Sequence, residues 1–367
     1  MKRKLIISVT LILGLIVFKS CKKDPEITNG NNPNNHQTTP YTIERKAWYP
    51  PFKLPADNPL TEEGVMLGRM LFYDPIMSRD SSISCNSCHL QSRAFAESLK
   101  VSKGIRGQLL TRNSMPLFNL MWQSRFFWDG RVTNLREQVL IPIQAHDEMD
   151  LDLYSLTLKL NASEQYTPLF KKAFNTEKIT PNEVSKALEQ FLTSMVSFNS
   201  KIDQLFGRTD TLNVISASAL RGLNLFMKPV EDGGADCFHC HSNIPFFGNT
   251  SPGGSMANNG LNAVFTDKGL GRITGRPTDE GKFKIPSLRN IELTAPYMHD
   301  GRFATLDEVM DFYSDQMNFN SPNLDINILA HNQQLNLTQQ QKDDIVEFLR
   351  ALTDNEFINN PKFKNPF

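Results

Sequence analysis

The chain of 367 residues contains little cysteine and histidine, five and seven residues respectively, and its charged residues balance to a net charge of zero. Without an excess of positive charge, a nucleic-acid partner has no electrostatic support. After one apolar run near the N-terminus, no stretch is long enough to predict a membrane-spanning helix. The alternation of apolar and polar residues that is typical of strands is rare. The pattern favours a helical protein, in which each scarce histidine is worth inspecting for function.

Four of the five cysteines fall in two CxxCH pentapeptides, at residues 85–89 and 237–241. This pentapeptide is the attachment signal of a c-type haem. Its thiols form thioethers with the porphyrin vinyl groups, and its histidine becomes the proximal iron ligand. Zinc half-sites or disulfides would leave that histidine unexplained. The sequence therefore predicts two covalently bound haem c groups. Their attachment residues are Cys85, Cys88 and His89 in the first motif, and Cys237, Cys240 and His241 in the second.

The fifth cysteine, Cys21, follows a basic segment at residues 2–4 and an apolar run from Leu5 to Phe18. The run is short for a spanning helix and suits a signal peptide. A cysteine directly after it resembles a bacterial lipoprotein box, which predicts a signal peptide over residues 1–20 and a lipid anchor on Cys21. An ordinary signal peptide with an incidental cysteine remains an alternative. Both export the protein, as haem attachment requires, to the periplasmic side or the outer membrane.

The rest of the chain divides by composition. Residues 21–45 are rich in Asn, Pro and Thr and poor in apolar side chains, which predicts a flexible tether. The remaining residues exceed the length of one typical domain and suit two, each with one haem. We expect an N-terminal haem domain over residues 46–205, a C-terminal haem domain over 206–355 and a tail over 356–367. The linker between the domains is expected near residues 199–216.

Helical periodicity dominates both predicted domains. Thr61 can cap a helix with an apolar stripe, and capping boxes recur where a threonine precedes an acid or amide by three residues. The pairs are Thr180 with Glu183, Thr305 with Glu308, and Thr338 with Gln341. The expected fold class is all-α, with two cytochrome c-like haem domains packed together and few or no strands.

Short segments around the two pentapeptides resemble the bacterial di-haem cytochrome c peroxidase and MauG superfamily, over roughly residues 55–352. Their order along the chain matches that family. The segments are Thr111-Arg112-Asn113, Phe127-Trp128-Asp129-Gly130-Arg131, Glu148-Met149, Pro286-Ser287-Leu288-Arg289-Asn290 and the run from Thr294 to Gly301. The resemblance implies a peroxidatic haem in the N-terminal domain and an electron-transfer haem in the C-terminal domain.

The resemblance also implies how the first iron is exposed. In many classical members a histidine on the loop after the first motif blocks this iron until the enzyme is reduced. The matching residue here is Ile105, which cannot bind iron. No other histidine lies between His89 and His146. We therefore expect a high-spin first haem with an open distal face that needs no reductive activation.

Glu148 matches the family's distal acid, and Gln138 matches its companion amide. A carboxylate there would carry a proton from the inner to the outer oxygen of hydrogen peroxide. From the residues alone, a solvated acidic turn would be the favoured role of Glu148, and the resemblance reverses this preference. His146 is a nearby competitor for the proton-transfer role.

Two further assignments come from the resemblance. Trp128 matches a tryptophan that lies between the haems and can relay electrons, although in isolation it could be a core aromatic. Asn113, Thr294 and Pro296 match a calcium site between the domains, where oxygen ligands suit a hard cation. No acidic cluster in the sequence marks such a site.

The sixth ligand of the second haem decides its potential. Classical peroxidases place a Met at the position that Tyr313 occupies here, whereas MauG-type enzymes have Tyr. An anionic oxygen ligand stabilises ferric iron, and Met with His raises the potential. Met310, three residues before Tyr313 on one predicted helix, and Met298 are alternatives. Each also has an ordinary core role.

The resemblance implies a peroxidase that reduces hydrogen peroxide to water with electrons from a small cytochrome c or cupredoxin. One alternative is a MauG-like oxidase of a protein or small substrate, with peroxide as the oxidant. The other is a lipid-anchored di-haem electron carrier. Family members are often dimers, so the resemblance allows a homodimer.

Overall fold

The computed structural model describes residues 36–44, 49, 51–205, 213–241, 256–331 and 333–367. The predicted signal peptide, Cys21, most of the predicted tether and residues 206–212 of the predicted linker lie outside these ranges. Thr38–Phe367 form one compact unit, which contains both haem motifs.

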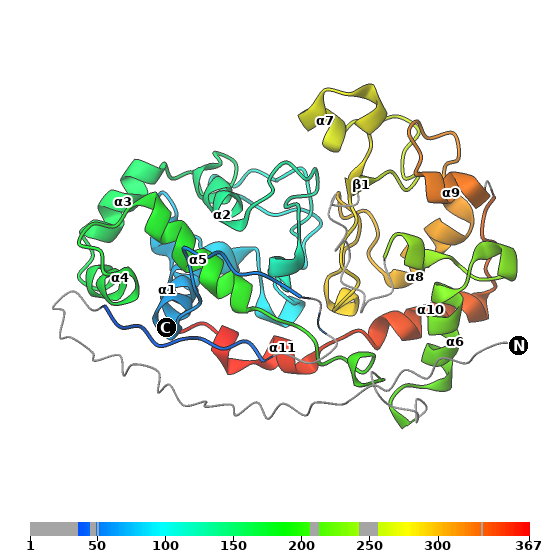
Figure 1. Cartoon of the computed structure of the whole chain (residues 1–367). Helices are drawn as coiled ribbons and strands as arrows, with labels where there is room; N and C mark the ends of the chain where they lie inside the picture. The colour runs from blue at the N-terminus through cyan, green and yellow to red at the C-terminus, as the bar shows by residue number, and fades with distance from the viewer. Residues whose placement is uncertain (1–35, 45–48, 50, 206–212, 242–255, 332) are drawn as a thin grey trace, which may run out of the picture. The chain divides into compact units, whose positions relative to one another are not determined.

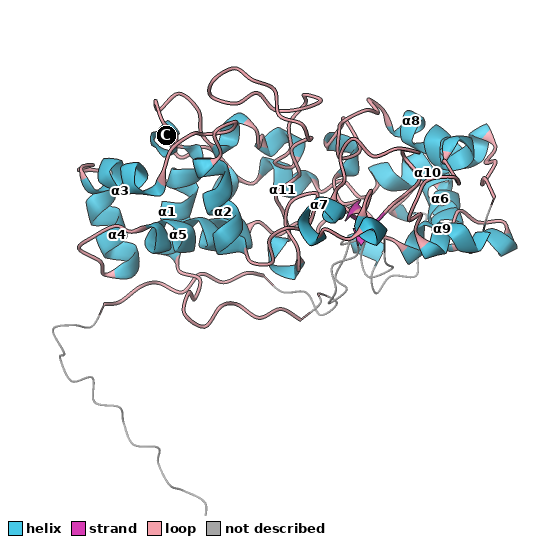
Figure 2. Ribbon diagram, turned by 90° about the horizontal axis from the view of Figure 1, so that it is seen from above, coloured by secondary structure: helices cyan, strands magenta, loops and turns pink. Residues whose placement is uncertain are grey.

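Helices dominate the unit, as Figure 2 shows. They are α1 (Glu62–Tyr73), α2 (Leu135–Gln144), α3 (Leu153–Asn161), α4 (Tyr166–Phe174), α5 (Pro181–Ser194), α6 (Ala217–Met227), α7 (Leu270–Thr274), α8 (Leu306–Asp311), α9 (Ile326–His331), α10 (Gln339–Arg350) and α11 (Asn355–Asn359). Among the described residues the only sheet pairs β1 (Met256–Ala257) with β2 (Phe283–Lys284), antiparallel. This confirms the predicted all-α class.

The first hydrophobic core is built by α1 to α5 (Figure 1). Thr61 caps α1 and the Thr180 capping box opens α5, both as the sequence predicts. The two helices approach closely because Gly68 has no side chain. A Cβ at Gly68 would lie 1.9 Å from the carbonyl oxygen of Ala187. This close crossing brings Leu71 and Phe191 into the fully buried centre of the core.

The second core is built by α6, α8 and α10. The Thr305 and Thr338 capping boxes open α8 and α10 as predicted. A glycine again permits the main crossing, since a Cβ at Gly222 of α6 would lie 1.9 Å from the carbonyl oxygen of Asp344 on α10. Each CxxCH motif therefore follows a helix, α1 or α6, that is anchored in its own core.

Both ends of the compact unit pack on the first core. In Figure 1, α11 runs from the end of α10 back towards α1. Phe357 and Phe363 belong to the first core, and the Tyr73 hydroxyl donates to the Phe363 carbonyl over 2.6 Å. The backbone N–H of Tyr41 donates to the Leu60 carbonyl over 3.0 Å. The structure thus differs from the tether predicted up to residue 45, because the apolar side chains of Tyr41 and Ile43 find partners on the first core.

A buried polar network joins the segments that run between the two cores. Asp354, at the start of α11, accepts hydrogen bonds from the Ser197 hydroxyl and the Asn199 backbone. Its own backbone N–H donates to the side chain of Asn290 over 2.8 Å. Chain segments distant in sequence therefore meet at one residue, Asp354, whose carboxylate lone pairs are satisfied in the interior.

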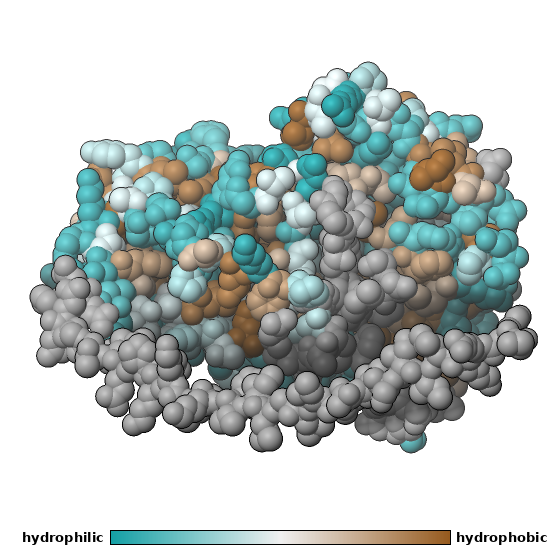
Figure 3. All heavy atoms as spheres, in the orientation of Figure 1, coloured by the Kyte–Doolittle hydropathy of each residue, from teal (hydrophilic) through white to brown (hydrophobic). Residues whose placement is uncertain are grey.

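The described surface is mostly hydrophilic on the face that Figure 3 shows, with hydrophobic residues in small, separate patches. Within the described ranges, no helix has both the length and the apolar character needed to cross a membrane.

The α1–α5 crossing gives a stability test. Gly68→Ala should lower the free energy of unfolding by about 1–3 kcal/mol, because the added methyl group must displace the backbone of α5. Urea denaturation of the haem-loaded protein measures the change. Met66→Ala, at an exposed position on the same helix, is the control and should shift stability by about 0.5 kcal/mol or less. Equal effects of the two substitutions would contradict the tight crossing.

Candidate functional site

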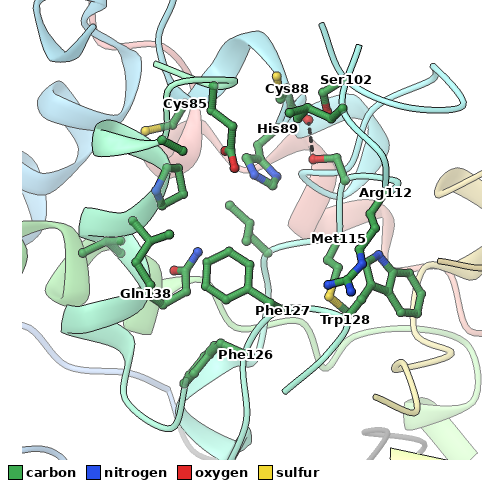
Figure 4. A pocket seen from close by; sticks show the side chains of 18 of the residues that line it. Cys85, Cys88, His89, Ser102, Arg112, Met115, Phe126, Phe127, Trp128 and Gln138 are labelled. Carbon is green, nitrogen blue, oxygen red and sulfur yellow. Dashed lines mark hydrogen bonds between the residues drawn. The ribbon is translucent and has the colours of Figure 1, made fainter. Parts of the chain in front are cut away.

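The first CxxCH motif lines a cavity of about 480 Å³. Cys85–Ser87 form a single 3-10 turn, and the His89 backbone donates to the Cys85 carbonyl over 3.0 Å. This turn places both thiols and the imidazole beside one another. Figure 4 shows Cys85, Cys88 and His89 on one side of the open space, with Gln138 and Phe127 opposite.

The imidazole of His89 is held in one tautomer. Its Nδ1 lies 2.7 Å from the backbone oxygen of Phe95. A carbonyl oxygen only accepts, so Nδ1 carries the proton and Nε2 keeps its lone pair. Burial lowers the pKa of His89, which also keeps the ring neutral. The carbonyl is brought back by a tight turn in which Ala94 and Phe95 both adopt positive φ. An oriented, neutral imidazole of this kind is suited to bind a metal.

The second motif repeats the arrangement in a second cavity of about 250 Å³. The His241 backbone donates to the Cys237 carbonyl over 3.0 Å. Its Nδ1 lies 3.2 Å from the backbone oxygen of Pro286, so Nε2 again keeps its lone pair. Burial lowers the pKa of His241 to about 4. The orienting carbonyl here comes from a distant part of the chain rather than from the motif's own turn.

The residues of both cavities fit a haem c group. The four described cysteines are free thiols, so the disulfide alternative does not apply. Within the described ranges no cluster of three His, Cys, Asp or Glu could hold a metal ion, so the zinc alternative has no ligand set. Each cavity instead offers two thiols, one imidazole nitrogen and a largely apolar lining, which suits a porphyrin.

Glu148 and Gln138 both line the first cavity. Gln138 projects from α2, and Glu148 lies in the turn that follows this helix. Burial raises the pKa of Glu148 to about 7, with a further rise from Asp147 and an opposing effect from Arg131. A carboxyl group with such a pKa can both accept and donate a proton near neutral pH. His146 is exposed, pairs with Asp150 and does not line the cavity.

The loop after the first motif packs against the turn that carries Glu148. The backbone N–H of Ile105 donates to the Glu148 carbonyl over 2.9 Å. Gly104 is needed at this contact, because a Cβ there would lie 1.9 Å from the Asp147 carbonyl oxygen. Ile105 itself does not line the cavity. The loop therefore supports the Glu148 turn from behind and places no Ile105 side chain in the cavity.

Trp128 lines both cavities. Its indole N–H donates to the Asn113 carbonyl over 2.9 Å, and its own carbonyl accepts from the Lys284 backbone over 2.8 Å. The two bonds fix the indole in the wall that the cavities share. One cavity is thus lined by four residues to which the sequence assigned a role, namely His89, Glu148, Gln138 and Trp128.

The residues assigned to calcium lie at the second cavity, which Asn113, Thr294 and Pro296 all line. The side-chain nitrogen of Asn113 lies 3.2 Å from the Leu99 carbonyl oxygen and 3.3 Å from that of Lys100. Backbone oxygens and an amide are therefore gathered at this place, and calcium binding there stays a prediction.

The three candidates for the sixth ligand, Tyr313, Met310 and Met298, all line the second cavity. Tyr313 and Met298 share one neighbour. The side-chain nitrogen of Asn259 donates to the Tyr313 hydroxyl over 3.0 Å and lies 3.7 Å from the Met298 sulfur. Burial raises the pKa of Tyr313 to about 12, and the Asn259 hydrogen bond opposes this rise. Met310 is buried within the second core.

The helix that carries Met310 and Tyr313 departs from the expected geometry. The α-helical part, α8, ends at Asp311, and Phe312–Gln316 form a π-helix. Met310 therefore lies in the α-helical part and Tyr313 in the π-helix, and both line the second cavity. A π-helical turn of this kind is frequent at functional sites.

Sequence reasoning missed three contributors to the two cavities. Asn259 and Lys284 are polar side chains without a motif of their own, and the Phe95 carbonyl belongs to the backbone. Lys284 lies two residues before the Pro286–Asn290 segment that resembles the family. This position was the one indication in the sequence that Lys284 lies near a cavity.

Comparisons with known proteins agree with this geometry. The family model of the di-haem cytochrome c peroxidases matches residues 62–211. Methylamine utilization protein MauG of Methylorubrum extorquens is 34% identical over 301 residues, which cover 81% of this chain and 80% of that protein. Cytochrome c551 peroxidase of Nitrosomonas europaea is 35% identical over 306 residues, which cover 82% and 81%. A solved structure of a MauG-like protein associated with microbial copper homeostasis aligns with a TM-score of 0.80 at 32% identity, covering 89% of this chain and 99% of that one.

Proposed function

Because the chain belongs to the di-haem cytochrome c peroxidase and MauG family, we propose that it reduces hydrogen peroxide to water. The electrons come from a small cytochrome c or cupredoxin and enter through the second haem. The observation that carries this proposal is Glu148, a carboxyl group with a pKa of about 7 that lines the same cavity as His89. An acid–base group beside an iron-binding imidazole is what cleavage of peroxide requires.

The first haem, when bound by Cys85, Cys88 and His89, supplies an iron that binds peroxide and exchanges electrons with it. Glu148 takes a proton from one peroxide oxygen and returns it to the other, so that water can leave. Gln138 lines the same cavity and offers an amide that holds peroxide in position. Over one turnover, two electrons and two protons convert one hydrogen peroxide into two water molecules.

Trp128 supplies an aromatic ring in the wall between the two cavities. Electrons that enter at the second cavity must reach the first, and the indole lies in that direction. Its two hydrogen bonds keep the ring fixed, so the separation on either side of it stays constant.

A MauG-like, peroxide-dependent oxidase of a protein or small substrate is the second candidate. Two residues favour it, Ile105 in place of a blocking histidine and Tyr313 at the sixth-ligand position. The relative named MauG is as similar to the chain as the relative named a peroxidase. A lipid-anchored di-haem electron carrier is a third candidate, which would leave the Glu148 carboxyl without a task.

We further propose export to the periplasmic side or the outer membrane, with a lipid anchor on Cys21. Calcium held by Asn113, Thr294 and Pro296 between the two haem domains, and a homodimer, complete the proposal. The export signal is the basic and apolar run before Cys21.

A turnover assay separates the three candidates. Purified protein mixed with reduced cytochrome c and hydrogen peroxide should oxidise the cytochrome at a rate that depends on peroxide. Absence of this oxidation, together with a peroxide-induced change in the haem spectrum, would favour the oxidase. A haem spectrum that peroxide does not alter would leave the electron carrier.

The role of Glu148 is tested by Glu148→Gln. The substitution should leave both haems in place and slow the reaction with peroxide by about 10²–10⁴-fold, because the proton acceptor is lost. In the unaltered protein the rate should rise as the pH passes about 7, where Glu148 becomes the carboxylate, and the variant should lose this dependence. Stopped-flow absorbance measures both. His146→Gln, at an exposed neighbouring position, is the control, and unchanged peroxide kinetics in Glu148→Gln would remove Glu148 from the reaction.

The sixth ligand is tested by Tyr313→Met. Replacing an oxygen ligand by a thioether should raise the reduction potential of the second haem. A spectroelectrochemical titration measures the shift. Met310→Leu, a substitution within the second core, should leave the potential in place. If the spectrum and the potential of Tyr313→Met match those of the unaltered protein, the ligand is Met298 or Met310.

A further inference from the structure

Lys284 is the only lysine among the buried residues that the structure describes, with 5% of its surface exposed. It lies on β2, and its backbone N–H donates to the Trp128 carbonyl over 2.8 Å. It lines both cavities. A charged side chain is therefore buried in the wall that the two haem cavities share.

Among the residues that the structure describes, none gives this ammonium group a counter-charge. Its Nζ donates to the side-chain oxygen of Gln123 over 3.1 Å, and no carboxylate of the described residues lies within ion-pair distance. Burial alone lowers the pKa of Lys284 to about 8. The other deeply buried cation, Arg289, is treated differently, because both of its terminal nitrogens pair with Asp203.

A buried ammonium without an anion is costly, since desolvation is not repaid by a charge partner. The three protons on Nζ can serve more acceptors than Gln123 provides. We therefore expect an anion to lie next to the Lys284 ammonium group when the protein carries its cofactors.

The position of Gln123 indicates which cavity supplies that anion. Gln123 lines the first cavity and not the second, so Nζ lies on the side of the first. Gln123 precedes Phe126 by three residues, and Figure 4 shows Phe126 at the far end of the first cavity from Cys85 and Cys88. In a haem c the two propionates lie on the edge opposite the vinyl groups that the cysteines bind. A haem attached at Cys85 and Cys88 directs its carboxylates away from these thiols.

We propose that Lys284 is the counter-charge of a propionate carboxylate of the first haem, and that this pairing raises the reduction potential of that haem. Reduction adds one negative charge at the iron, and a nearby buried cation stabilises the reduced form. The proposal rests on the two haems that family membership implies, and it is independent of which reaction the protein performs.

The test compares three variants of the full haem-loaded protein by spectroelectrochemical titration. Lys284→Gln keeps a hydrogen-bond donor and removes the charge. At a fixed solution potential it should lower the ferrous-to-ferric ratio of the first haem about tenfold. For a one-electron couple this ratio corresponds to a decrease of about 59 mV in the reduction potential. Lys284→Arg keeps the charge and should stay near the unaltered protein. Lys282→Gln is the matched control, because Lys282 lies two residues away and already pairs with Asp279.

The proposal is overturned if Lys284→Gln shifts the first haem no more than Lys282→Gln does, or if the second haem shifts more than the first. Haem content per chain is measured alongside. If Lys284→Gln fails to retain the first haem, the test rests on Lys284→Arg. Because this variant keeps the positive charge, the pairing predicts that it keeps both the haem content and the reduction potential of the unaltered protein. An Arg variant as defective as the Gln variant would contradict the pairing. No turnover is measured, so the outcome is separate from that of the peroxidase assay.

Discussion

Two hydrogen bonds on Trp128 hold together the wall from which both cavities are formed. One connects the indole to the Asn113 carbonyl and the other connects the Trp128 carbonyl to the backbone of Lys284. Asn113 follows the first motif in sequence, whereas Lys284 lies between the second motif and its orienting carbonyl at Pro286. The shared wall is therefore assembled from both halves of the chain, and neither cavity is complete without it.

The histidines of the two pentapeptides, His89 and His241, obtain the same tautomer in different ways. His89 is oriented by Phe95, only six residues away, through a turn that includes two residues of positive φ. His241 is oriented by Pro286, 45 residues away. The first site is thus locally encoded, whereas the second depends on the segment that also contacts Trp128. A displacement of that segment would alter the second imidazole and the shared wall together.

Much of this arrangement could be predicted from the sequence, because the decisive features are local. The pentapeptides predict haem attachment, and threonine caps such as Thr180 mark helix starts through hydrogen bonds within one turn. The missed features depend on tertiary contacts. The π-helical turn at Tyr313, the burial of Lys284 and the packing of Tyr41 on the first core are each set by neighbours distant in sequence. Glu148, which the family resemblance assigns to the first haem, lines the first cavity, and its raised pKa arises from burial that no sequence pattern encodes.

The segment after α10 has a consequence for biogenesis. Phe357 and Phe363 complete a core whose other members all precede residue 200. During synthesis the N-terminal half is made first, yet these two rings are added only after the whole C-terminal half. The first core therefore lacks two of its aromatic rings until synthesis of the chain is nearly complete.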